Sequence, residues 1–159
     1  MAHNVTKFSD RGLPYGSGVD LDALTLSARY TVFRFPIVGT AYVQNATTKH
    51  NLGCVGVAGT VRGAYWSGKT VVAGGTLTGQ LVAYDASGNA EVALTDTFNP
   101  ESATAREGFA LTLATTNVAL AADDTFEFHA VASDSAVTDI TEGVLTVIFE
   151  PSEASQPTR

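Results

Sequence analysis

Near the C-terminus, residues 126–151 alternate apolar and polar side chains in two short stretches, and this alternation constrains the fold more than any other feature of the sequence. A period of two is typical of a β-strand with one face against a core. The polar residues 133–143 between the stretches read as a loop, and Pro151 ends the second strand because proline has no amide hydrogen to donate. The predicted core faces are Phe126, Phe128 and Ala130 in the first strand and Leu145, Val147 and Phe149 in the second.

The most distinct hairpin in the sequence spans residues 76–98. Residues 76–84 and residues 90–98 both alternate, and the intervening residues 85–89 have the composition of a tight turn. We therefore predict two antiparallel strands joined by that turn.

Other stretches predict further strands and loops. Residues 28–38 are rich in β-branched and aromatic residues, and Pro36 among them indicates an edge strand or a bend. Residues 52–63 read as a strand weakened by glycines, whereas the polar residues 45–51 before them read as a loop. Together with the alternating residues 108–115, these patterns predict about eight to ten short strands and no long helix.

Layer packing limits the architecture that such strands can form. Short strands with one apolar face bury that face when two sheets pack together. The predicted fold class is all-β, an antiparallel β-sandwich or jelly roll, with a closed barrel as the alternative. Residues 28–151 form this domain, after an extended N-terminal arm of residues 1–27 and before a polar C-terminal tail of residues 152–159.

The N-terminal arm contains turn-forming residues but no sustained periodicity. Phe8, Leu13 and Tyr15 are isolated apolar side chains in it, with no regular element to bury them. Either they lie across the domain or insert into a neighbour, or they belong to a frayed terminus.

The charge composition excludes one class of partner. The net charge is −7 and the sequence pI is near 4.7, whereas binding to a phosphate backbone requires clustered lysine and arginine. Nucleic acid is therefore not expected as a partner. Charged residues make up only 16% of the chain, so much of the surface is neutral and suits packing against copies of itself or a partner.

The sequence shows no signal for export or membrane insertion. The first residues lack an apolar signal core, and no stretch approaches about 18 consecutive apolar residues. We expect a protein that is made in a cytoplasm and has no membrane partner. The single cysteine, Cys54, excludes an internal disulfide and reads as a small buried hydrophobe.

Residues 63–70 match the phosphate-binding pattern G-x-x-x-x-G-K-[ST]. That pattern requires a helix that begins at its lysine, because the backbone amides of the helix must face the phosphates. Lys69 is followed by the β-branched residues 70–72 and then by two glycines at 74–75, a sequence that does not suit a helix. The prediction is strand, turn and strand, without nucleotide binding.

Other residues with catalytic or metal-binding chemistry are scattered along the chain. His3, His50 and His129 lack the spacing of a zinc site, and His129 is placed on the solvent or interface face of its strand. Five acidic residues in two loops offer oxygen ligands for Ca²⁺, but their spacing matches no defined calcium loop, which favours solvated charge. These residues are Asp123, Asp124, Asp134, Asp139 and Glu142. We therefore expect no enzymatic activity, no cofactor and no metal site.

Three stretches carry a family resemblance: GGTLTGQLVAYDASGNAEVALTDTF, LTLATTNVALAADDTFEFHAVASDSA and GVLTVIFEP. Their common texture is threonine- and alanine-rich strands, with an ALAADD turn before a strand in the second stretch and a terminal strand ending in proline in the third. They resemble the small all-β virion proteins of tailed bacteriophages, in particular the head decoration, or cement, proteins. The similarity covers about Ala58 to Pro151. It includes no catalytic or binding motif, so no residue roles are carried over.

The resemblance implies a non-enzymatic virion structural protein that binds the outer surface of a capsid, with the major capsid protein as partner. Family members commonly form trimers or dimers that reinforce the shell, so a homo-oligomer is expected, with a trimer as the leading state and a dimer as the alternative. It would assemble in the host cytoplasm and reside on the virion. Phe8, Leu13 and Tyr15 are then the candidate capsid or subunit contacts.

The alternative function is a carbohydrate- or receptor-binding β-sandwich module of a phage tail or fibre. Tyr65 and Trp66 would be its binding residues, because aromatic rings in a turn can stack on a sugar. A single tryptophan in a domain of this size is more often part of a core or an interface.

Overall fold

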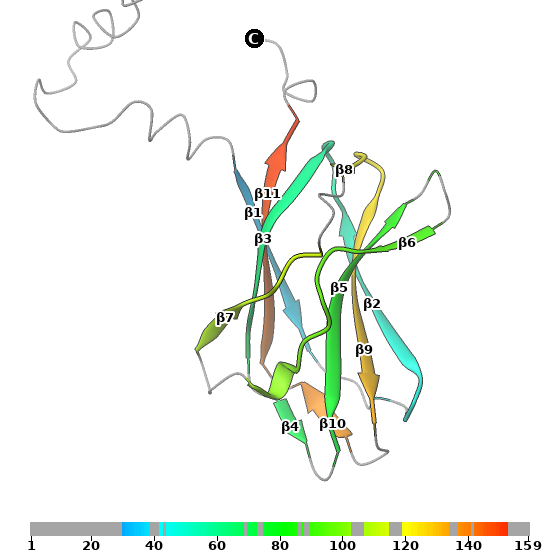
Figure 1. The fold of residues 1–159 in the computed structure, drawn as a ribbon, viewed down its shortest axis with the longest axis vertical. Coiled ribbons are helices and arrows are strands. Elements are labelled where there is room, and N and C mark those ends of the chain that lie inside the picture. Colours follow the sequence, from blue (N-terminus) through cyan, green and yellow to red (C-terminus); the bar gives the residue numbers. More distant parts are fainter. Residues whose placement is uncertain are drawn as a thin grey trace, which may run out of the picture.

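Two antiparallel β-sheets pack face to face around an apolar core (Figure 1). The computed structural model describes residues 30–38, 42, 44–68, 70–72, 75–85, 87, 90–102, 107–114, 119–133, 137–140 and 142–152. These residues contain no α-helix, and their one helical element is a 3-10 turn at Pro100–Ser102. The predicted all-β sandwich is confirmed.

The two sheets, here called sheet A and sheet B, contain nine of the eleven described strands, and all pairings between these strands are antiparallel. The order in sheet A is β1 (Thr31–Ile37), β11 (Gly143–Pro151), β3 (Gly59–Ser67) and β7 (Gly108–Ala110), and β8 (Ala119–Leu120) also pairs with β3. The order in sheet B is β2 (Thr47–Cys54), β9 (Thr125–Ala132), β5 (Leu77–Asp85) and β6 (Ala90–Ala93). Two further strands, β4 (Thr70–Val72) and β10 (Val137–Ile140), pair at one end of the sandwich (Figure 1).

The two strands predicted from the C-terminal alternation are β9 and β11, and they are central strands of different sheets. Their predicted apolar faces both point into the sandwich and are fully buried. Phe126 of β9 meets Phe149 of β11 edge to face, with ring centroids 6.3 Å apart. The alternation in β9 and β11 therefore marks the inward faces of two different sheets, which pack against each other in one core.

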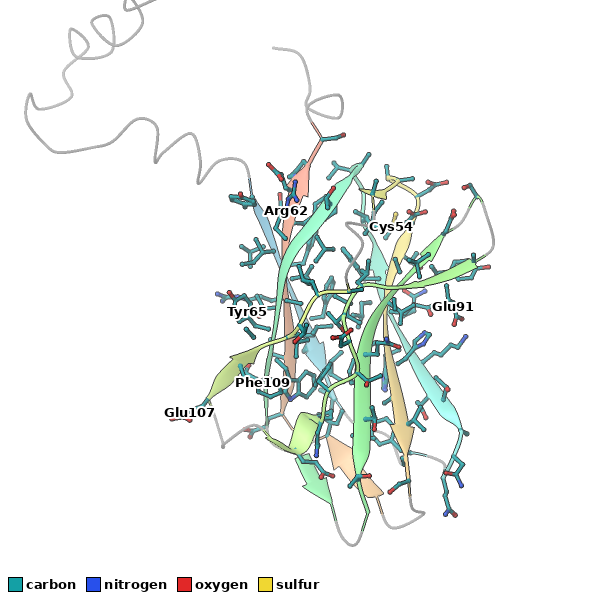
Figure 2. The ribbon with its side chains drawn as sticks, viewed as in Figure 1. Cys54, Arg62, Tyr65, Glu91, Glu107 and Phe109 are labelled. Atoms are coloured by element: carbon teal, nitrogen blue, oxygen red, sulfur yellow. The ribbon has the colours of Figure 1, made fainter. Side chains whose placement is uncertain are left out.

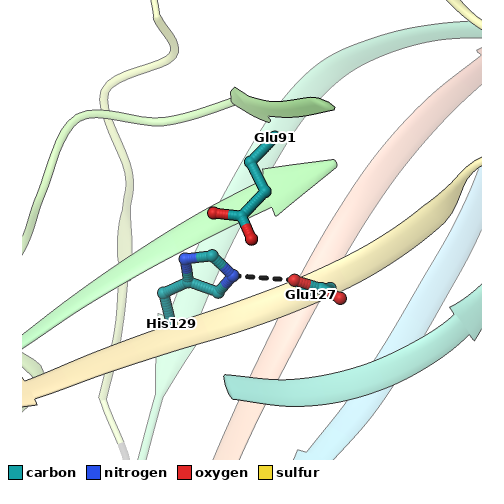
Figure 3. A group of neighbouring side chains, drawn as sticks. All are labelled: Glu91, Glu127 and His129. Atoms are coloured by element: carbon teal, nitrogen blue, oxygen red, sulfur yellow. Dashed lines mark hydrogen bonds and ion pairs between the residues drawn. The ribbon is translucent and has the colours of Figure 1, made fainter. Parts of the chain in front are cut away.

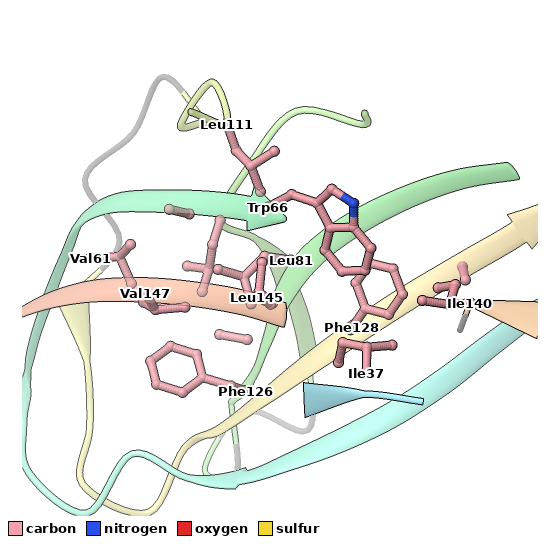
Figure 4. Packing of buried hydrophobic residues seen from close by; sticks show 14 of the residues in the cluster. Ile37, Val61, Trp66, Leu81, Leu111, Phe126, Phe128, Ile140, Leu145 and Val147 are labelled. Atoms are coloured by element: carbon pink, nitrogen blue, oxygen red, sulfur yellow. The ribbon is translucent and has the colours of Figure 1, made fainter. Parts of the chain in front are cut away.

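Trp66 of β3 is fully buried in the core (Figure 4). Its ring stacks on Phe128 of β9, with centroids 5.5 Å apart. Its indole Nε1 donates a hydrogen bond of 3.1 Å to the carbonyl oxygen of Pro100. The 3-10 turn thus gives the buried indole the polar partner that it needs.

Two local predictions are confirmed. Strands β5 and β6 form the expected hairpin, and in its turn Asp85 accepts hydrogen bonds from the amide and the hydroxyl of Ser87. Pro36 lies in β1, which is an edge strand of sheet A. An edge strand tolerates proline because a missing amide hydrogen on the free side leaves no ladder bond unmade.

Other local predictions are wrong. Residues 45–51 do not form a loop, because most of them belong to β2, a polar edge strand of sheet B. Residues 52–63 are not one strand, because the chain leaves sheet B after Cys54 and enters sheet A at Gly59, helped by the positive φ of Gly53 (112°) and Gly56 (80°).

The region after β9 also differs from the prediction. The expected loop of residues 133–143 contains β10, which pairs with β4. The described residues form eleven strands, more than the number predicted, because several have only two to four residues and so show no measurable periodicity.

The predicted arm and most of the predicted tail lie outside the described residues, as do Phe8, Leu13 and Tyr15. The division into arm, domain and tail stays a prediction. Among the helical segments that the structure describes, none has the length and apolar character needed to cross a bilayer.

Replacing Phe128 by alanine should lower the free energy of unfolding by about 3–5 kcal/mol, because a buried ring is lost and leaves a cavity beside Trp66. Urea denaturation followed by Trp66 fluorescence measures this change. Tyr65→Ala, on the outward side of β3, is the control and should stay within about 0.5 kcal/mol of the wild type. Equal losses for the two variants would contradict the assignment of the core.

Candidate functional site

A polar cluster lies on the outward face of sheet B and is formed by side chains from three strands. Glu127 and His129 come from β9, Glu91 comes from β6, and Lys49 comes from β2. Directly paired residues of antiparallel strands share a face, and Lys49 and Gln80 are both paired with His129. The inward positions of β9 carry Phe126 and Phe128, so the cluster lies on the side of sheet B that faces away from the core.

Glu91, Glu127 and His129 bring their ligand atoms together (Figure 3). Nε2 of His129 and Oε2 of Glu127 form a hydrogen bond of 2.8 Å. The carboxylate of Glu91 approaches the same imidazole, and one potential ligand atom from each residue lies within 4.8 Å of the others.

Lys49 forms an ion pair with Glu91 at the exposed side of the cluster. The hydrogen bond to Glu91 raises the pKa of Lys49, and the same bond lowers the pKa of Glu91. Both groups are therefore charged at neutral pH. An exposed pair of this kind contributes little to stability because water screens it.

The base of the cluster excludes water. His129 is 9% exposed, and Val82, which is paired with Glu127 on the outward face, is 3% exposed. His129 was predicted on the solvent or interface side of its strand. It does lie on the outward face, but neighbouring side chains bury it.

Sequence spacing alone could not reveal this cluster. Glu127 and His129 show an i, i+2 spacing that puts them on one face. Glu91 joins them only through the pairing of β6 with β5 and of β5 with β9. The sequence showed the alternation of residues 90–98, but it did not show the order of strands that places Glu91 beside Glu127 and His129.

The outward face of sheet A has a different character. Val32 is 53% exposed and pairs with Ile148, and Tyr65 is 43% exposed and pairs with Thr146. Arg34, also paired with Thr146, is exposed on the same face. Figure 2 shows Tyr65 and Arg62 on the sheet A side of the domain and Glu91 on the far side of sheet B.

Arg62 and Glu150 form an ion pair at one end of this face. They line a shallow, open hollow together with Gly59, Thr60 and Pro151. The hollow is shallow, so a small molecule in it would keep much of its surface in contact with water.

The phosphate-loop match has the structure that the sequence analysis predicted. Residues 63–67 are the second half of β3, and Thr70–Val72 form β4, so strand follows turn where a nucleotide site would need a helix. Lys69 lies outside the described residues.

The two aromatic residues proposed for sugar stacking, Tyr65 and Trp66, point to opposite sides of β3. Trp66 is 0% exposed in the core, whereas Tyr65 points outward from β3, so the two rings do not form one platform. They lie in a strand and not in a turn. Because Trp66 is buried, it does not serve as a sugar-stacking residue in the alternative carbohydrate-binding function.

The prediction for Cys54 is wrong, because this residue is exposed. A register shift between Asn51 and Gly53 changes the direction of the following side chains in β2. Its thiol donates a hydrogen bond of 2.8 Å to the carbonyl oxygen of Ala122.

The acidic loops considered for Ca²⁺ are separated by β9. Asp123 and Asp124 precede this strand, whereas Asp139 of β10 and Glu142 follow it at the other end of the sandwich (Figure 1). Asp134 lies outside the described residues. The Asp124 carboxylate is buried and accepts a hydrogen bond of 2.8 Å from the amide of Ala121. It acts as a turn acceptor.

His50 provides a prediction for pH dependence. It packs against Tyr42 and Phe128, and this burial lowers the pKa of its imidazole from the usual 6.5. The unfolded chain therefore binds this proton more readily, so the stabilising contribution of neutral His50 is lost as the pH falls below about 6.5. The wild type should lose more stability than His50→Gln between about pH 7.5 and about pH 5.5 in urea denaturation. Parallel curves for the two proteins would contradict this.

Comparisons with known proteins give little further information. No family model matches the chain, and no curated protein matches it. One chain in the structure of the infectious bursal disease virus Gx strain is similar to this chain, with 12% sequence identity and a TM-score of 0.39. The match covers 80% of this chain and 34% of that one, so this chain spans about a third of its length. Similarity at this level carries no argument about function.

Proposed function

We propose that the chain is a non-enzymatic structural protein of a virion, which binds the outer surface of a tailed-bacteriophage capsid as a homo-oligomer. The observation that carries this proposal is the exposed apolar face of sheet A. The proposal includes no cofactor for this role and no nucleic-acid or membrane partner. It agrees with the resemblance of residues 58–151 to head decoration proteins.

Exposed apolar side chains are concentrated on sheet A. Of the five large hydrophobic residues that are exposed in the described part of the chain, four lie on or beside β1 and β3. They are Tyr30, Val32, Val38 and Tyr65. Val32 pairs with Ile148 on the adjacent strand, which extends the patch across the sheet. Exposed apolar patches of this kind commonly mark protein contacts.

The charge of this face differs from that of the whole chain. Arg34 is exposed on sheet A without a carboxylate among its paired residues, and Arg62 is exposed there in an ion pair with Glu150, in a chain of net charge −7. The face is therefore suited to a partner segment that is apolar and carries some negative charge.

The N-terminal arm of a neighbouring copy is the occupant that we propose for this face. The arm leads into Tyr30 at the start of β1, the edge strand of sheet A. It contains Phe8, Leu13 and Tyr15, together with three aspartates and two basic residues, Lys7 and Arg11. A segment of 27 residues reaches up to roughly 90 Å when extended, which is enough to cross to a neighbour.

Arm exchange of this kind gives a closed ring when each subunit passes its arm to the next, and a trimer is one such ring. Many such contacts on a capsid lattice add avidity, so each contact with the major capsid protein can be weak. In the host cytoplasm the oligomer would form before it meets the capsid.

Val32→Asp tests the face, and Val131→Asp is the matched control, because Val131 is an exposed valine of sheet B. A carboxylate at position 32 would have to lose its water at the proposed contact. We expect Val32→Asp, and deletion of residues 1–27, to shift the protein from trimer to monomer in size-exclusion chromatography with light scattering. Val131→Asp should remain a trimer.

Binding to the capsid is measured by co-sedimentation with heads of the encoding phage prepared without this protein. Val32→Asp should bind at least about tenfold more weakly than Val131→Asp. A monomeric wild type that does not sediment with these heads would refute the proposal. Unchanged assembly after deletion of the arm would refute the assigned occupant.

A further inference from the structure

We propose that Glu91, Glu127 and His129 bind one divalent transition-metal ion, Zn²⁺ in particular, on the outward face of sheet B. The three residues place one carboxylate or imidazole ligand atom each within 4.8 Å of the others (Figure 3). This site was not expected from the sequence, and it is independent of the function proposed for sheet A.

The ligand set suits Zn²⁺ in type and in spacing. Imidazole nitrogen and carboxylate oxygen bind Zn²⁺ at about 2.0–2.2 Å, and tetrahedral ligands are then separated by roughly 3.4 Å. Nε2 of His129 and Oε2 of Glu127 are 2.8 Å apart, so a small rotation of either side chain opens the required space. Three protein ligands leave a fourth position for water or a further ligand.

Two of the ligands are already held in position. His129 and Glu127 project from β9, which is paired on both sides, with β2 and with β5. Their side chains are only 10% and 15% exposed, and buried Val82 lies beside them on the same face. Ordered, partly dry ligands lose little freedom when they bind an ion.

The third ligand comes from an edge strand. Glu91 lies in β6, which joins sheet B only through β5 in the described part of the chain. Its side chain is 39% exposed and can move the remaining distance toward the ion. A bound ion would therefore link β6 to β9 across β5.

The charges of the cluster favour a cation. Glu91 and Glu127 contribute two negative charges, and Lys49 contributes one positive charge through its ion pair with Glu91. A divalent ion neutralises the two carboxylates better than this single ammonium group, whose side chain is 47% exposed and free to swing into solvent. Lys49 therefore competes with the metal for Glu91.

The competition between Lys49 and the metal provides a sharp experiment. Full-length protein is treated with EDTA, desalted and titrated with Co²⁺, which replaces Zn²⁺ and reports its ligands through visible absorption. Zn²⁺ should then displace the Co²⁺. We expect about one ion per chain, with affinity reduced at least about tenfold in Glu127→Gln and His129→Ala.

Two further variants distinguish the site from an ordinary ion-pair network. Lys49→Met should bind Co²⁺ more tightly than the wild type, because the competing ammonium group is gone. His50→Gln is the matched control, since His50 is the next residue along β2 and faces Tyr42 and Phe128 on the other side of the sheet. It should bind Co²⁺ as the wild type does.

Folding of each variant is checked by Trp66 fluorescence, and Glu127→Gln and Lys49→Met still test the site if His129→Ala does not fold. The proposal is overturned if neither the wild type nor Lys49→Met binds Co²⁺. It is equally overturned if Co²⁺ binding is undiminished in Glu127→Gln.

Discussion

The packing of β9 against β11 determines the positions of the other elements. Each strand is central in its own sheet, and their inward aromatic rings meet where Phe126 contacts Phe149. Because a strand has a period of two, fixing the phenylalanines inward fixes every outward residue as well. A slip of one residue in β9 would put His129 into the core and Phe128 into water.

The alternation of single strands was readable from the sequence, because burial of one face leaves a direct trace in the residue pattern. It identified both central strands and the β5–β6 hairpin. It failed for β2, since a polar edge strand such as residues 47–54 has little alternation to show. It also failed at Cys54, where a shift in pairing reverses the side-chain direction.

The candidate sites depend on which strands are neighbours and on which way each side chain faces, and a single sequence does not give either directly. Glu91 lies close to His129 because β6 pairs with β5 and β5 pairs with β9. Tyr65 and Trp66 point to opposite sides of sheet A because they are consecutive residues of one strand. Local composition suggested that the surface would be neutral, but not that its two broad faces would differ. Sheet A exposes apolar side chains with two arginines, whereas sheet B exposes a compact group of ionisable side chains.

The pairing of β1 with β11 has a consequence for biosynthesis. The first described strand can complete its ladder only with the last, and the register runs from Thr31 opposite Phe149 to Ile37 opposite Gly143. A growing chain therefore holds Phe33 and Phe35 without their sheet until Pro151 has left the ribosome. Such non-local pairing slows folding and exposes an unpaired strand edge meanwhile. Completion of sheet A therefore waits for β11, and a nascent chain stalled before residue 143 would hold β1 without its partner strand.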